Sequence, residues 1–149
     1  LHAPEITPDG SILLFDNGND RPVPGPPYSR AVRVVVDDSS PDPSQWTARQ
    51  TWEFRTDDLA TGQPLYADFL GDADQLANGN ELVGFGGIGQ EVPPARGRIV
   101  EVVPTGTSGG DIVWDVTVPD TWTSYRAERL TSLYGGPRWE TDFVPPLVS

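Results

Sequence analysis

Three side chains in the first part of the sequence could act on an anionic group: His2, Arg21 and Arg30. An imidazole is neutral near pH 7 and can serve as a nucleophile, as a general acid or base, or as a donor to an oxyanion. A guanidinium group presents a planar fork of N–H donors and keeps its charge at every accessible pH. These three residues are therefore the candidates for chemistry.

Each candidate also has a structural interpretation. His2 could be a terminal residue without a role, Arg21 could pair with Asp16 or Asp20, and Arg30 could belong to a structural ion pair. The carboxylate and amide oxygens of Asp16, Asn17, Gly18 and Asp20 could bind calcium, with Asp16 and Asp20 as the main candidates, but their spacing lacks the bidentate acid of an EF-hand. An Asx turn that shapes the loop and orients Arg21 is the favoured role for this segment.

Short β-strands must position these residues. The 16 prolines and 16 glycines punctuate short apolar stretches rich in Val, Ile, Trp and Tyr, which indicates an all-β fold. The pattern occurs twice, with Gly10 and Gly79 at corresponding turns. The first round predicts strands over 2–7, 11–15, 30–36, 46–55 and 66–69. The second predicts a turn and strand within 74–85, a loop over 86–96, and strands over 97–103, 111–118 and 124–133.

Four or so short strands per round are typical of a β-propeller blade. We therefore expect two blades, residues 1–70 and 71–135, followed by a Pro-rich tail over 136–149. Trp52 and Trp114 occupy corresponding places and are predicted to pack in the core or between blades. Because two blades cannot close a ring, the remaining blades are expected from missing sequence or from partner chains, for example three copies forming six blades.

Composition excludes several classes of protein. The 149 residues carry a net charge of −12, which disfavours nucleic-acid binding because phosphates require a basic face. There is no cysteine, hence no disulfide framework, and no apolar run approaches the length of a membrane span. The sequence has no methionine, so we expect a processed product or a fragment of a larger chain. The acidity fits an exported protein.

Five segments, in order along the chain, carry a family resemblance: residues 2–21, 28–32, 50–54, 71–80 and 124–134. Together they resemble the arylsulfotransferase family. The resemblance implies the C-terminal blades of a six-bladed propeller, located outside the cell or in the periplasm. It also implies transfer of a sulfuryl group from an aryl sulfate to a phenol through a sulfated histidine, with no cofactor. The chain departs from the family in having one histidine.

The resemblance also implies roles for individual residues. His2 would be the nucleophile or acid–base group, and Arg21 would hold the sulfuryl oxygens with Arg30 in reserve. Tyr28 could stack on an aryl group, and Arg126 lies in a second Tyr-Arg-Ala segment with a similar binding role. The alternative is a non-catalytic extracellular propeller that serves as a binding or structural module, which the single histidine, the Pro-rich loops and the acidity would suit.

Overall fold

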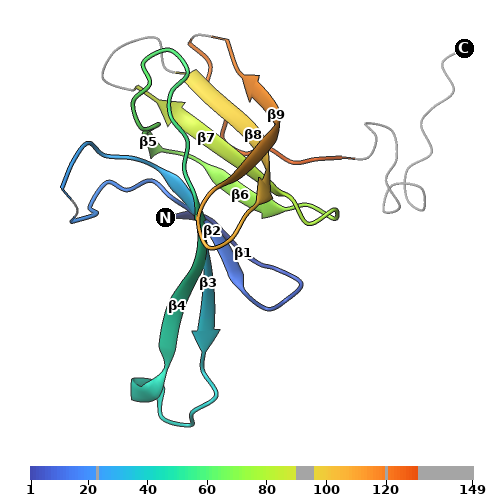
Figure 1. Ribbon diagram of the computed structural model, residues 1–149. Helices are drawn as coiled ribbons and strands as arrows, with labels where there is room; N and C mark the ends of the chain where they lie inside the picture. The colour runs from blue at the N-terminus through green and yellow to red at the C-terminus, as the bar shows by residue number, and fades with distance from the viewer. Residues whose placement is uncertain (23, 90–95, 120, 131–149) are drawn as a thin grey trace, which may run out of the picture.

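The computed structural model describes residues 1–22, 24–89, 96–119 and 121–130, and within them the fold is all-β with two antiparallel sheets (Figure 1). The first sheet has the order β1-β2-β3-β4, and the second has the order β5-β7-β8-β9 with β6 also paired to β7. The strands are β1 (His2–Ile6), β2 (Ile12–Asp16), β3 (Arg30–Asp37), β4 (Thr47–Phe54), β5 (Ala67–Phe69), β6 (Asp72–Gln75), β7 (Glu81–Ile88), β8 (Arg96–Pro104) and β9 (Gly110–Thr117), and one 3₁₀ turn, η1 (Pro43–Gln45), precedes β4.

The two sheets open on turns with the same hydrogen bonds. In the first, the Gly10 N–H donates to the Thr7 carbonyl at 2.9 Å, and in the second the Gly79 N–H donates to the Leu76 carbonyl at 2.9 Å. Both glycines have a positive φ, +83° and +85°, which glycine adopts without a steric penalty. The all-β prediction is confirmed, and the turns explain why the sequence pattern occurs twice.

The hydrophobic core lies where the two sheets pack against each other. The rings of Phe15 and Phe85 meet edge to face, with centroids 5.4 Å apart. Trp52 on β4 is 4% exposed, and its Nε1–H donates to the carbonyl of Gly109 at 2.9 Å. The turn between β8 and β9 therefore covers the outer strand of the first sheet, while the hairpin of β3 and β4 extends beyond the second sheet (Figure 1).

Several strand assignments made from the sequence need correction. The strand predicted at 66–69 exists as β5, but it pairs with β7 of the second sheet instead of closing the first round. β7 runs to Ile88, so the predicted loop begins later than Gly86. Residues 124–130 form no strand; the rest of that predicted strand and the 136–149 tail lie outside the described residues.

The two tryptophans have different environments although they occupy corresponding register positions. Trp52 pairs with Arg33 and Trp114 with Glu101, in each case next to a β-bulge. The prediction that both tryptophans pack is confirmed for Trp52. For Trp114 it stays a prediction, since that side chain is 42% exposed in the described structure. The second sheet covers the face of β4, and no described sheet covers the face of β9.

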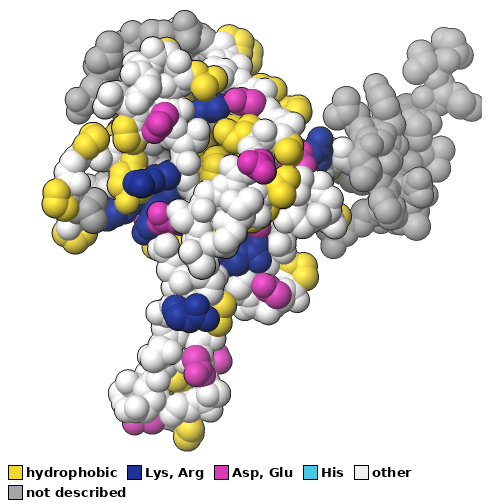
Figure 2. Space-filling view, viewed as in Figure 1, with side chains coloured by type: hydrophobic (Ala, Val, Ile, Leu, Met, Phe, Trp, Pro, Cys, Tyr) yellow, Lys and Arg dark blue, Asp and Glu magenta, His cyan; other side chains and the backbone are white. Residues whose placement is uncertain are grey.

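Charged side chains of both signs are interspersed over the face seen in Figure 2, without one continuous basic patch. The net charge of the full sequence is −12. Among the described residues, no helix has the length and apolar character needed to cross a membrane.

Acidic side chains gather where β1 contacts β6. Oε1 of Glu5 accepts a hydrogen bond from the Gln75 N–H at 3.3 Å. Burial, followed by the negative charge of Asp72 and a hydrogen bond with Glu5, raises the pKa of Asp74 to about 7. Burial also raises the pKa of Asp72. The contact between the sheets therefore contains a carboxyl group that titrates near neutrality.

Replacing Asp74 by Asn should flatten the dependence of stability on pH. The pKa of Asp74 rises from 3.8 to about 7 in the folded state. The folded state then holds the proton more tightly, and the free energy of unfolding falls as pH rises from about 4 to about 7. At pH 8 we expect Asp74→Asn to be roughly 1–2 kcal/mol more stable than the parent protein, after allowance for solvent screening.

Denaturant unfolding of both proteins at pH 5 and pH 8 measures this difference. Asp38→Asn is the matched control because Asp38 is an exposed carboxylate of the β3–β4 hairpin. A pH dependence that is the same in Asp74→Asn and in the parent protein would contradict the assignment of Asp74.

Candidate functional site

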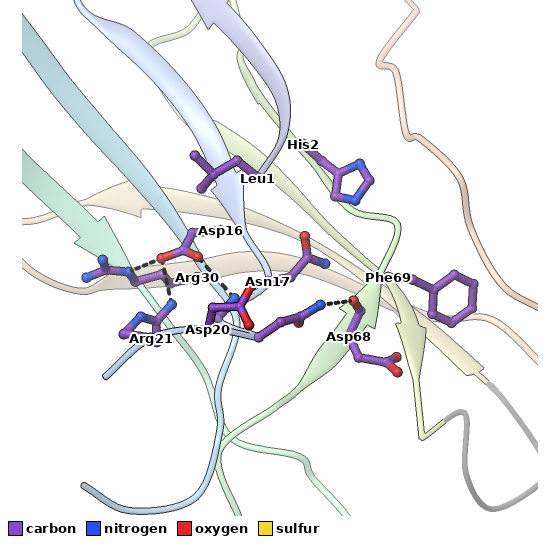
Figure 3. Close-up of a pocket in the computed structure, with 11 residues that line it drawn as sticks. Leu1, His2, Asp16, Asn17, Asp20, Arg21, Arg30, Asp68 and Phe69 are labelled. Carbon is purple, nitrogen blue, oxygen red and sulfur yellow. Dashed lines mark hydrogen bonds and ion pairs between the residues drawn. The ribbon is translucent and has the colours of Figure 1, made fainter. Parts of the chain in front are cut away.

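The candidate residues gather at one end of the strands of the first sheet, where β1 starts, β2 ends and β3 starts. His2, Arg21 and Arg30 line one pocket with a volume of about 430 Å³, together with Asp16 and Phe69 (Figure 3). The structure therefore brings these three candidate residues together, and their roles in chemistry stay a prediction.

Asp16 binds both candidate arginines through one oxygen. Its Oδ2 accepts from Nη2 of Arg21 at 2.6 Å and from Nε of Arg30 at 3.0 Å. Burial alone would raise the pKa of Asp16, but the hydrogen bonds and charges of the two arginines outweigh it and lower the pKa. Burial likewise opposes the charge of Arg30, whose pKa is nevertheless raised by Asp16 and Glu53. Asp16 and Arg30 therefore remain charged near neutral pH.

The turn after β2 has the predicted Asx geometry. Oδ1 of Asp16 accepts from the Gly18 N–H at 3.0 Å, and the Arg21 N–H donates to the Gly18 carbonyl at 3.3 Å. Nη1 of Arg21 then donates to the Tyr28 carbonyl at 3.1 Å, across the loop. Arg21 therefore pairs with Asp16, as its structural interpretation expects, and it also lines the pocket.

Gly18 is required by this turn, and Gly18→Ala should be strongly destabilising. Gly18 has φ +86°, and a Cβ there would lie 2.3 Å from the Tyr28 carbonyl oxygen and 3.0 Å from Nη2 of Arg21. Gly10→Ala is the matched control, since Gly10 has φ +83° and open space around it. We expect Gly10→Ala to cost about 1 kcal/mol and Gly18→Ala at least about 2 kcal/mol more. Equal midpoints in denaturant unfolding would contradict this account.

Tyr28 and Arg126 are placed differently from what their predicted binding roles require. The Tyr28 ring contacts two guanidinium groups, with Arg21 at 4.0 Å and Arg55 at 5.0 Å from its centroid. The ring therefore supports Arg21. Arg126 is exposed, stacks on Tyr125 at 5.6 Å and lines a separate pocket. The structure brings Tyr28 to the candidate site and leaves Arg126 outside it.

His2 is held in β1. It pairs with Phe15 of β2, and a bulge follows it, with Ala3 in a left-handed conformation at φ +45°. Such a bulge redirects neighbouring side chains. His2 is half-buried and lines the pocket on the side away from the arginines (Figure 3). The interpretation of His2 as an unstructured terminal residue therefore does not describe this structure.

The calcium interpretation finds no support in the geometry. Asp16 already binds two arginines, and Asp20 is exposed. Within the described ranges, no group of three or more His, Cys, Asp or Glu side chains has an arrangement that could hold a metal ion.

Sequence reasoning missed two residues that shape the pocket, Asn17 and Phe69. Asn17 is 4% exposed, and its Nδ2 donates to the carbonyls of Ala67 at 2.7 Å and Leu70 at 2.8 Å. It thereby ties the turn to β5, and β5 brings Phe69 into the pocket. From the sequence, Asn17 has a place only in the turn or in the calcium interpretation, and no local signal connects it to β5.

Comparison with known proteins gives one match. Residues 1–126 match the family model described as arylsulfotransferase (ASST). Curated proteins and solved structures give no significant match. The matched range contains every strand of both sheets as well as the pocket residues.

Proposed function

Because the chain belongs to the arylsulfotransferase family, we propose that it transfers a sulfuryl group from an aryl sulfate to a phenol in the pocket of His2, Arg21 and Arg30. The observation that carries the proposal is the arrangement of that pocket. One imidazole and two guanidinium groups line a single cavity large enough for a small molecule.

In the proposed reaction, a ring nitrogen of His2 attacks sulfur. The N–S bond forms as the S–O bond to the aryl group breaks, and the phenolate leaves and takes a proton from solvent. The oxygen of the acceptor phenol then attacks sulfur, the N–S bond breaks, and the phenol proton is released. His2 returns to its neutral form, so atoms and charge balance over the two steps without a cofactor.

The arginines would stabilise charge on the sulfuryl oxygens during both steps. Each guanidinium has five N–H donors. Arg21 donates two hydrogen bonds to described residues and Arg30 also donates two, which leaves donors on both. Asp16 and Glu53 offset the two positive charges overall. Directed N–H donors, instead of a net positive field, would therefore recognise the ester.

The test is turnover of 4-nitrophenyl sulfate by the full native polypeptide with phenol as acceptor. We expect release of 4-nitrophenolate and formation of phenyl sulfate. With the acceptor omitted, a peptide containing His2 should gain the mass of one SO₃ group. If the correctly folded native protein shows neither turnover nor the sulfated peptide, the non-catalytic binding module becomes the better account.

We also propose that the two sheets are neighbouring blades of a six-bladed propeller, with the other blades supplied by further sequence or by partner chains. The uneven exposure supports this: Trp52 lies beneath the turn of the second sheet, whereas the corresponding Trp114 is 42% exposed. Light scattering of the 149-residue chain should give a trimer if partner chains close the ring. A monomer would exclude closure by copies of this chain.

For the location of the protein, we propose the periplasm or the extracellular space, on the basis of the family. Fractionation of the producing cells tests this, since recovery of the native protein from the cytoplasm alone would contradict it.

A further inference from the structure

We propose that the ring of Phe69 binds the aryl group of the sulfate ester and of the phenol, and so selects aromatic ligands for this pocket. The inference rests on the proposed function for the identity of the donor. The binding of an aromatic ring at Phe69 can be tested without any turnover.

The position of the Phe69 ring is fixed by a glycine on the neighbouring strand. Phe69 pairs with Gly87, next to a bulge that follows Ala67. A Cβ at Gly87 would lie 2.0 Å from Cε1 of Phe69, so the ring packs directly on the backbone of β7. The half-buried ring therefore has one side held by the protein and contributes to the wall of the pocket. A fixed ring of this kind can stack on another ring without losing conformational freedom.

The pocket has apolar and charged parts that match the two parts of an aryl sulfate. Among the described residues that line the pocket, Phe69 provides the only benzene ring, and Leu1 is the only other large apolar side chain. In Figure 3, Phe69 lies on the side of His2, whereas Asp16 and the two arginines lie on the opposite side. A ligand with a ring at one end and an anionic group at the other could contact both parts.

Other aromatic residues are less suited to this role. The Tyr28 ring is occupied by Arg21 and Arg55. Trp122 and Tyr125 are 67% and 65% exposed and do not line this pocket. The aryl contact first expected of Tyr28 is therefore reassigned to Phe69.

The experiment measures binding of 4-nitrophenol and of inorganic sulfate to the full native protein by calorimetry. Neither ligand alone allows sulfuryl transfer. We expect Phe69→Leu to weaken 4-nitrophenol binding roughly three- to tenfold, as loss of one aromatic pair predicts, and to leave sulfate binding unchanged. Phe69→Tyr should retain the parent affinity. Trp122→Leu is the matched control, since it removes an exposed ring outside the pocket.

Two results would overturn the proposal: equal weakening of both ligands in Phe69→Leu, or an effect no larger than that of Trp122→Leu. If 4-nitrophenol binding depends selectively on Phe69 while no variant or parent protein turns over an aryl sulfate, the proposed function fails and the assignment of Phe69 stands.

Discussion

Replacing His2 by Asn is expected to reduce turnover of 4-nitrophenyl sulfate by at least about a thousandfold, since the proposed N–S intermediate cannot form without the imidazole. The free energy of unfolding should change by less than about 0.5 kcal/mol, because His2 is half-buried and forms no hydrogen bond through its side chain to the described residues. His2 is the only histidine of the 149 residues, so no other imidazole within them can replace it.

Added imidazole provides the control for His2→Asn. A small imidazole that enters the vacated space should restore part of the turnover, and it should not stimulate the parent protein. The sulfated peptide should be absent from the variant. Turnover of His2→Asn within tenfold of the parent value would show that the nucleophile is another group, and the role of His2 would then be limited to the pairing of β1 with Phe15.

The local sequence pattern predicted the strands that carry the pocket but not their long-range partners. The apolar run of β2 and the Val-rich β3 define their own positions, and their pairing places Asp16 opposite Arg30. By contrast, β5 was predicted as a strand, but the sheet that it joins was not. β5 pairs with β7 of the second sheet because Gly87 leaves space for the Phe69 ring. A two-residue contact between distant strands has no periodicity from which it could be inferred.

The ion pairs that join Asp16, Arg21, Arg30 and Glu53 could be predicted from the sequence only in part, for a similar reason. The sequence indicated that Arg21 could pair with Asp16 because the two are close along the chain. That Arg30 shares the same carboxylate follows from the register of β2 and β3, and its second partner, Glu53, follows from β4. The environment of Trp114 depends on which elements cover its sheet, and this cannot be read from the sequence around it.

The role of Arg21 needs a test that separates catalysis from structure, because Arg21 both lines the pocket and closes the loop. Arg21→Ala would leave Asp16 with Arg30 as its one arginine partner and would remove the nearer of two cations from the Tyr28 ring. Arg21→Lys keeps the charge and can still reach Asp16, but it loses the planar fork that would hold two sulfuryl oxygens. We expect Arg21→Lys to lower kcat about a hundredfold, with a change in Tm of only a few degrees.

Arg55→Lys is the matched control for Arg21→Lys. Arg55 also lies over the Tyr28 ring, is exposed and lies outside the pocket, so the same substitution there should leave kcat within about twofold of the parent value. The kcat of Arg30→Lys should lie between the kcat values of Arg21→Lys and Arg55→Lys. A lysine at this position can pair with Asp16 or Glu53 but cannot bridge both as the guanidinium does. Similar kcat values for Arg21→Lys and Arg55→Lys would mean that Arg21 only shapes the loop, and Arg30 would then be the one arginine left to bind the sulfuryl group.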